Sequence, residues 1–393
     1  MDRRRFLKFA GAAAGAVALG PAFWEGTYAA AAQGLLATGA GPYGPLLAPD
    51  ANGVRLPAGF SSRVVARSLE VVPGSDYPWH VFPDGAATFA QPGGGWIYVA
   101  NSEAPLAGGA GAIVFDATGT VIGAHRVLSG TNMNCSGGRT PWGTWLSCEE
   151  HELGRVWECD PTGATAGVVR PALGTFWHEA VTVDPVAGVL YLTEDQPDGR
   201  FYRFVPDAYP SLDAGRLQVA SVDPVGRVTW LDVPDPTALT GGPTRLQVPA
   251  STAFDGGEGI WFDSGHVYFT TKGDDRVWDY LTGRGQLRVL YDGAAHPEAP
   301  LHGVDNLTVT AGGDIYVCED GGDLQICLIT PQRRVAPFLQ VVDHPGSELS
   351  GIAFSPAADR LYFSSQRGGG TGITYEVTGP FRQPGTSSGA VAG

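Results

Sequence analysis

A short apolar segment recurs six times along the chain, and it is rich in the β-branched and aromatic residues typical of buried strands. The copies are residues 97–100, 145–148, 190–193, 267–270, 315–318 and 361–364. Measured at the second residue of each copy (98, 146, 191, 268, 316 and 362), the steps are 48, 45, 77, 48 and 46 residues. Four of these five steps have the length of one propeller blade, so the sequence predicts an all-β protein with a six-bladed β-propeller.

The long third step indicates an insertion, which we expect at residues 207–249, where Pro, Gly and polar residues dilute the pattern. A two-sheet sandwich is the alternative fold, but it requires no regular spacing. The 57 Gly, 30 Pro and 17% charged residues also suit short strands joined by tight turns. We expect an N-terminal extension at 33–53, the propeller at 54–380 and a flexible tail at 381–393.

A second apolar strand precedes most copies, at residues 178–184, 258–263, 305–309 and 348–354, and turn residues separate most of these pairs. Each pair is therefore expected to form a hairpin. In a hairpin the start of the first strand and the end of the second lie at the same edge. Residues at both places should then converge on one face of the propeller, near its axis.

The first 32 residues have the pattern of an export signal. Arg3 and Arg4 are followed by a Phe-Leu-Lys run, a modest apolar stretch and several small residues. This pattern predicts twin-arginine export with the translocase as a transient partner, and a periplasmic or secreted protein. An amphipathic anchor helix is the less favoured alternative, and we expect no stable membrane anchor.

The net charge of −15 repels phosphate backbones and anionic membranes, so nucleic acid is not expected as a partner. We expect a monomer that acts on a small molecule. The five cysteines leave at least one thiol unpaired in a monomer, and no C-x-x-C pair supports a zinc ribbon.

Acidic residues gather at the strand ends that should converge. They are Glu179, Glu258, Asp305 and Glu348 at the starts of first strands, and Glu103, Glu149 with Glu150, Glu194 with Asp195, and Glu319 with Asp320 at the ends of second strands. One such residue alone would more often contact water. Together they predict a metal-binding face, because crowded carboxylates need cations and oxygen ligands suit Ca²⁺.

Cys135 lies at the equivalent position of another blade, near the start of its first strand. It is expected to be either a metal ligand or a small buried residue. As a thiolate it would add a softer metal such as iron or zinc. The role of His178 stays open: it could be a metal ligand, a proton carrier or a packing residue. Cys148 and Cys318 are expected in the core, and Cys159 and Cys327 in the core or in a disulfide.

Positive charge is scarce near this face. Lys272 and Arg276 follow a second strand and Arg139 follows Cys135, so these three are the candidates for holding an anionic substrate. The alternative for Lys272 is a salt bridge to a neighbouring carboxylate.

The segment 135–150 resembles a signature of the PhoX-type alkaline phosphatases. Further segments agree, at 177–180, 192–195 with 201–206, 257–261, and 304–306 with 318–320. The resemblance spans about residues 54–366 and identifies the chain as a shorter member of this family. It implies a six-bladed propeller, a twin-arginine signal, an axial cofactor of ferric iron and calcium, and hydrolysis of a phosphate monoester.

Carried over by motif, the resemblance makes Cys135 the thiolate on iron. Its carboxylate ligands would be Glu103, Glu179, Glu258 and Glu319 or Asp320, with Asp305 and Asn306 lining the same site. The chain departs from the family at Gly256, where these phosphatases carry an arginine two residues before the glutamate that matches Glu258.

Two other functions stay open. Six-bladed propellers with axial Glu, Asn and Asp also perform calcium-dependent lactonase chemistry, which is an analogy of fold. A propeller that keeps calcium only for stability would be a binding or structural protein.

Overall fold

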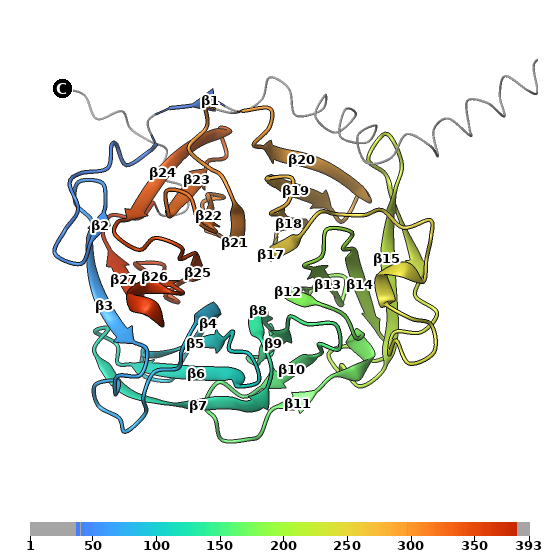
Figure 1. Ribbon diagram of the computed structural model, residues 1–393, viewed down its shortest axis with the longest axis horizontal. Helices are drawn as coiled ribbons and strands as arrows, with labels where there is room; N and C mark the ends of the chain where they lie inside the picture. Colours follow the sequence, from blue (N-terminus) through green and yellow to red (C-terminus); the bar gives the residue numbers. More distant parts are fainter. Residues whose placement is uncertain (1–36, 40, 297, 383–393) are drawn as a thin grey trace, which may run out of the picture.

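The computed structural model describes residues 37–39, 41–296 and 298–382, which form six β-sheets arranged in a ring (Figure 1). No α-helix occurs in these residues, only the 3₁₀ turns η1 (Pro171–Leu173), η2 (Thr244–Leu246) and η3 (Gly368–Gly370). The predicted six-bladed propeller is therefore confirmed. The expected export signal at 1–32 and the residues after 382 lie outside the described part of the chain.

The first three complete blades follow one another along the chain. They comprise β4 (Pro83–Ala90), β5 (Trp96–Ser102), β6 (Gly108–Phe115) and β7 (Val121–Thr131); β8 (Asn134–Arg139), β9 (Trp145–Glu149), β10 (Val156–Cys159) and β11 (Val168–Val169); and β12 (His178–Asp184), β13 (Val189–Glu194), β14 (Phe201–Pro206), β15 (Gly215–Val222) and β16 (Val228–Asp232). The expected insertion at 207–249 holds β15, the extra strand β16 and η2.

The fourth and fifth blades continue this order. They comprise β17 (Gly257–Asp263), β18 (His266–Thr271), β19 (Arg276–Leu281) and β20 (Gln286–Asp292), then β21 (Val304–Val309), β22 (Ile315–Glu319), β23 (Gln325–Ile329) and β24 (Arg334–Val341). Two short N-terminal strands, β1 (Ala37–Thr38) and β2 (Val54–Arg55), pair with the outer strand β24.

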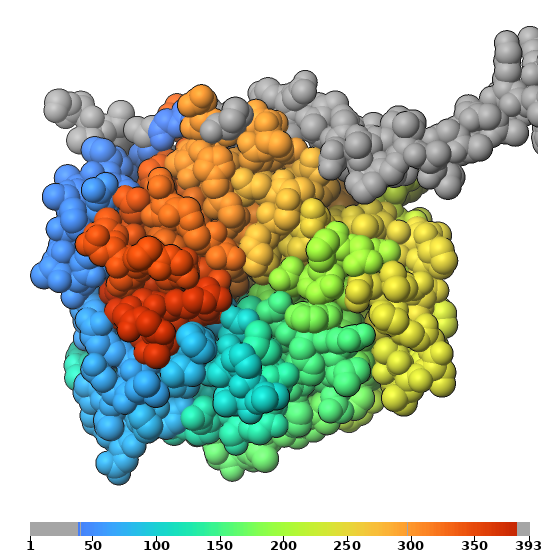
Figure 2. All heavy atoms as spheres, viewed as in Figure 1, coloured from blue at the N-terminus to red at the C-terminus, as the bar shows by residue number. Residues whose placement is uncertain are grey.

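The sixth blade closes the ring with both ends of the described chain. Its inner three strands are β25 (Leu349–Phe354), β26 (Arg360–Ser365) and β27 (Ile373–Thr378), and its outer strand is β3 (Ser61–Arg67). In Figure 2 the blue N-terminal atoms accordingly lie beside the red C-terminal ones. This pairing ties the first part of the propeller to the last, so neither blade is left without a neighbour.

The six recurrent apolar segments all lie on the second strand of a blade, where they supply the core between neighbouring blades. Tyr98 and Tyr362, from adjoining blades, have ring centroids 5.1 Å apart, and the Tyr98 hydroxyl donates to the Gly351 carbonyl at 3.2 Å. Phe201 and Phe269 stack at 4.5 Å across another interface. Because the core lies between blades, the polar ends of the inner strands are left to meet at the axis.

Candidate metal centre

The inner strand of every blade begins with the same irregularity. The first residues of the inner strand pair with the end of the second strand. The register then shifts, and two residues of the inner strand are left without a partner in the second strand. Such a bulge bends a strand and re-aims its side chains. The first residue of the bulge is Asp84, Cys135, Glu179, Glu258 or Asp305 in five blades and Gly351 in the sixth. The inner strands surround the axis (Figure 1), so five of the six bulges bring an acid or a thiol to it.

A second repeat stands at the end of the second strands. In every blade, the residue that follows the second strand donates its backbone N–H to the carbonyl of the residue that precedes the inner strand's first paired residue. For example, Glu103 donates to Phe82, and Glu150 donates to Met133. The six residues held in this way are Glu103, Glu150, Asp195, Lys272, Asp320 and Gln366. The rim of the channel therefore carries a second, mostly acidic layer.

These two layers bring possible metal ligands together in four overlapping groups. Within each group the ligand atoms lie within 4.8 Å of one another. The groups are Asp84, Glu103 and Cys135; Cys135, Glu150 and Glu179; Glu179, Glu258 and Asp305; and Asp305, Asp320 and Glu348. We call these nine residues the ligand ring. Shared members link the groups, so the arrangement suits several neighbouring cations.

Glu179 provides the physical test of whether cations fit this ring. Its side chain is fully buried, and neither carboxylate oxygen has a hydrogen-bond partner among the described residues. Burial, reinforced by Glu258 and Glu150, raises the pKa of Glu179 well above its ordinary value. A buried carboxylate without partners is costly unless it stays protonated or binds a cation. The donor set of carboxylate oxygens and one thiol fits hard cations with one softer metal.

The remaining acids of the ring show the same crowding. Burial, then Glu348 and Glu103, raises the pKa of Asp84 well above its ordinary range, although Gln366 donates hydrogen bonds to both Asp84 and Glu103. Burial and neighbouring carboxylates also raise the pKa of Glu348 to about 8, against the opposing effect of Arg367. Metal ions would remove this conflict by neutralising several carboxylates at once.

Three glutamates proposed from the sequence lie elsewhere, at the last position of the second strand. Glu149 accepts from the backbone N–H groups of Asn132 and Arg155, at 3.0 and 3.2 Å. Glu319 accepts from His302 and Gln325, at 3.0 and 2.9 Å. Glu194 accepts from the Tyr202 hydroxyl at 2.7 Å. Successive side chains of a strand point to opposite sides, so these three bind within their own blades while the next residues reach the axis.

Cys135 is the thiol of the ring and belongs to two of its groups. Burial, then Asp84 and Glu179, raises the pKa of Cys135 well above its ordinary value, so only a bound cation would favour the thiolate. All five cysteines are buried and free, which places Cys148, Cys159, Cys318 and Cys327 in the core without a disulfide. His178 packs on Phe176 with ring centroids 3.6 Å apart, and burial lowers its pKa to about 3.

The three candidate cations occupy different places. Lys272 contacts two members of the ligand ring, with its Nζ 2.6 Å from Glu258 and 3.3 Å from Asp320. Burial alone would lower its pKa, but Glu258, Asp305 and Asp195 outweigh it and raise the pKa. Arg276 is buried in its blade between Asp274 and Asp292. Arg139 ends β8, away from Cys135 at its start, and lines a pocket at the other mouth of the channel.

The structure adds residues that sequence reasoning missed. Asp84 belongs to the ring, and its signal was the Asp-Gly pair that matches the Glu258-Gly259 pair of another blade. Of the adjacent pair that the sequence proposed, Glu150 belongs to the ring and Glu149 does not. Arg367 forms an ion pair with Glu348 at 2.8 Å and is a second cation at this face. The side-chain amide of Asn306 donates to Asp305 and accepts from the Gly351 N–H, so it supports a member of the ring.

Comparisons with known proteins identify a family and structures of similar fold. A family model described as alkaline phosphatase PhoX matches residues 79–279. The solved structure of Pseudomonas fluorescens PhoX in complex with vanadate, a transition state analogue, is similar with a TM-score of 0.68 and 17% identity, over 88% of this chain and 98% of that chain. A gluconolactonase from Xanthomonas campestris gives a TM-score of 0.52 at 13% identity, over 86% and 99%. At these identities the structural likeness shows the fold alone. No curated protein sequence matched the chain.

We predict that Glu179→Gln lowers metal affinity by at least about 10-fold, because it removes a charge that belongs to two groups of the ring. Elemental analysis and calcium titration of the purified variant measure this. The matched control is Glu194→Gln, a buried carboxylate bonded to Tyr202 outside the ring, which should leave the metal content unchanged. Equal metal loss in both variants would contradict the placement of the ring.

We also predict that the metal-free protein becomes less stable as pH rises from about 5 to 8. The folded protein holds the Asp305 and Glu348 protons up to pKa values of about 6 and 8, above their ordinary 3.8 and 4.5. The folded state thus binds more protons than the unfolded state in this range, so raising the pH favours unfolding. Melting temperatures measured in chelator should fall with pH. They should fall less in Glu348→Gln, and much less in excess Ca²⁺; a rise with pH in chelator would contradict the prediction.

Proposed function

Since this chain belongs to the PhoX alkaline phosphatase family, we propose that it is a metal-dependent phosphatase that hydrolyses phosphate monoesters with iron and calcium held by the ligand ring. The observation that carries this proposal is the ring itself, with its buried and unpartnered Glu179 and its single thiol. The charged end of the substrate is a phosphate group, which needs concentrated positive charge, and bound metals would provide that charge in this acidic protein.

The two ends of the ring suit different metals. Cys135 with Glu103 and Asp84, and again with Glu150 and Glu179, offers mixed sulfur and oxygen ligands, which we assign to ferric iron. Glu179, Glu258 and Asp305, and then Asp305, Asp320 and Glu348, offer oxygen alone, which suits calcium. When bound, these cations would supply the charge that stabilises the phosphoryl oxygens as the ester bond breaks.

Lys272 is the residue we propose to hold the phosphate. It lies at the open rim, and its ammonium group is shared between Glu258 and Asp320. Metal ions bound to these carboxylates would take over their neutralisation and free the ammonium group for an anion. Gly256 supports this role: a Cβ built at position 256 would lie 3.8 Å from the Lys272 Cβ, so the lysine starts beside the place where family phosphatases carry their arginine.

Arg367 is a second cation on the same face, and its charge opposes the burial that raises the pKa of both Glu103 and Glu348. Lys272 and Arg367 both act on Glu103, so positive charge flanks the ring from two blades. We propose that they orient the phosphate while the metals neutralise it. Arg276 is excluded from this role by its buried ion pairs, and Arg139 by its place on the other side of the propeller.

A calcium-dependent lactonase is the second candidate, supported by the group of Glu179, Glu258 and Asp305, which needs no sulfur. The likeness to a gluconolactonase concerns the fold, so the metal decides between the two. Calcium without iron favours the lactonase, whereas iron bound through Cys135 favours the phosphatase. A propeller with calcium and no activity on either ester class would be a binding protein.

We propose export through the twin-arginine route to the periplasm or the medium. The support is the arginine pair and apolar stretch of residues 1–32, together with the family. In the part of the chain that the structure describes, no helix is long and apolar enough to cross a membrane. Export after folding would let the ring take up its metals in the cytoplasm.

Protein matured with iron and calcium should hydrolyse p-nitrophenyl phosphate, and Cys135→Ser should lose iron, visible absorbance and at least about 10-fold in turnover. Cys159→Ser, which alters another buried free thiol away from the ring, should retain all three. Metal-replete protein without turnover would contradict the phosphatase proposal, and full iron content in Cys135→Ser would contradict its role as ligand.

Lys272→Met should lower kcat/KM for p-nitrophenyl phosphate by at least about 10-fold, the effect of losing one charge-assisted contact to the phosphate. Metal content should not fall, because the lysine competes with cations for Glu258 and does not bind them. Lys272→Arg should restore part of the activity. Unchanged kcat/KM in Lys272→Met would show that this residue does not contact the substrate.

A further inference from the structure

The pocket lined by Arg139 lies at the opposite mouth of the channel from the ligand ring. It has a volume of about 560 Å³ and is lined by the far ends of the inner strands and by hairpin turns such as Pro141–Gly143 and Pro185. The inner strands β4, β8, β12 and β17 thus start at the ligand ring and end at the pocket, whereas β21 and β25 line it only near their bulges. The pocket was not expected from the sequence, which placed Arg139 with Cys135.

A tight floor separates the pocket from the ring. It is formed by the second residue of the bulges, among them Ser136, Gly259 and Asn306, which line the pocket. A Cβ added at Gly259 would lie 2.7 Å from the Asn306 backbone, and one added at Gly85 would lie 2.4 Å from the Ser136 backbone. Neighbouring strands therefore touch at this level, and the pocket is a site of its own rather than an entrance to the ring.

Arg139 is the positive charge of this pocket. Among the residues that line it, the charged ones are Arg139 and Asp160, and the Asp160 carboxylate is already engaged by the backbone N–H and hydroxyl of Thr162. The Arg139 guanidinium has no ion pair or side-chain hydrogen bond with any described residue; its contact is the face of Trp261, 5.7 Å from the ring centroid. An exposed cation with free donors, in a protein with a net charge of −15, marks a place for an anion.

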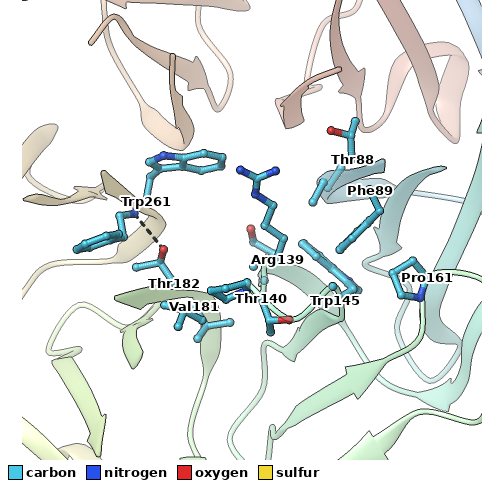
Figure 3. A pocket seen from close by; sticks show the side chains of 18 of the residues that line it. Thr88, Phe89, Arg139, Thr140, Trp145, Pro161, Val181, Thr182 and Trp261 are labelled. Carbon is cyan, nitrogen blue, oxygen red and sulfur yellow. Dashed lines mark hydrogen bonds between the residues drawn. The ribbon is translucent and has the colours of Figure 1, made fainter. Parts of the chain in front are cut away.

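The walls around Arg139 are flat and apolar. Figure 3 shows its side chain projecting between Trp261 on one side and Phe89 and Trp145 on the other. The lining threonines are largely engaged: Thr182 accepts from the Phe262 N–H and Thr88 donates to the Phe354 carbonyl. Polar recognition therefore centres on Arg139, and the rest of a ligand would contact aromatic and aliphatic surface.

We propose that this pocket is a second binding site, separate from the metal centre, for a small anion with a planar apolar body, such as an aromatic carboxylate. The carboxylate forms a bidentate pair with the Arg139 guanidinium, and the ring stacks on Trp261. The site does not depend on the proposed phosphatase activity, because its ligand carries no phosphate ester.

The test uses benzoate as the probe and full-length mature protein with its metals in place. Calorimetry or ligand-observed NMR should detect benzoate binding at millimolar concentrations, about 4 kcal/mol of affinity. Benzamide, which keeps the ring but lacks the charge, and acetate, which keeps the charge but lacks the ring, should each bind at least 10-fold more weakly, a factor equal to about 1.4 kcal/mol.

Arg139→Met should abolish benzoate binding, and Arg139→Lys should recover part of it. Arg284→Met is the matched control, an exposed arginine in the β19–β20 turn, and should bind like the unaltered chain. Circular dichroism and elemental analysis establish that each variant is folded and metal-loaded. Absence of benzoate binding to the unaltered protein, equal binding of benzamide, or unchanged binding in Arg139→Met would each overturn the proposal, whatever the outcome of the phosphatase assay.

Discussion

The crowding of buried negative charge at one rim of the propeller is the constraint on which the rest of the structure depends. Two unit charges 4 Å apart interact by about 4 kcal/mol at an effective dielectric constant of about 20, and the ring brings eight carboxylates and a thiol into overlapping groups. The fold produces this crowding through two repeated features: the bulge of the inner strand, which carries an acid or a thiol in five blades, and the backbone hydrogen bond at the end of the second strand, which holds an acid in four. Protons or multivalent cations must offset this repulsion. This holds above all for Glu179, whose buried carboxylate has no hydrogen-bond partner among the described residues.

Four of the inner strands, β4, β8, β12 and β17, carry opposite chemistry at their two ends. At their starts the bulges turn carboxylates to the axis, whereas further along Trp261, Phe89 and Val181 present apolar surface to the pocket. The layer between them is packed from small residues, such as Gly85 and Gly259, whose lack of a side chain lets neighbouring strands touch. A single channel is thereby divided into a charged site and an apolar site that can bind different ligands.

The function of a propeller depends on the residues at its axis and much less on the arrangement of its blades. A phosphatase and a gluconolactonase both resemble this chain in fold at low identity. The proposed activities differ in what they require of Cys135 and Lys272. A thiol among carboxylates suits a softer metal, and the Lys272 ammonium group, here paired with Glu258 and Asp320, would suit an anionic substrate once metals neutralise those carboxylates. A Cβ built at position 256 would lie 3.8 Å from the Lys272 Cβ, so the two positions adjoin.

The period of the apolar strands by itself determined the six-bladed propeller, since a buried strand between blades must recur once in each blade. The hairpin pattern likewise determined that Glu103, Cys135, Glu179, Glu258, Asp305 and Glu348 would converge, as they do in the structure. Only the tertiary structure decided between adjacent acids such as Glu149 and Glu150, because side chains alternate along a strand and the bulges reset that alternation. It also decided that Arg139, four residues from Cys135, lies at the opposite mouth. A strand advances about 3.3 Å per residue, so two residues that are near in sequence can lie at opposite ends of the same strand.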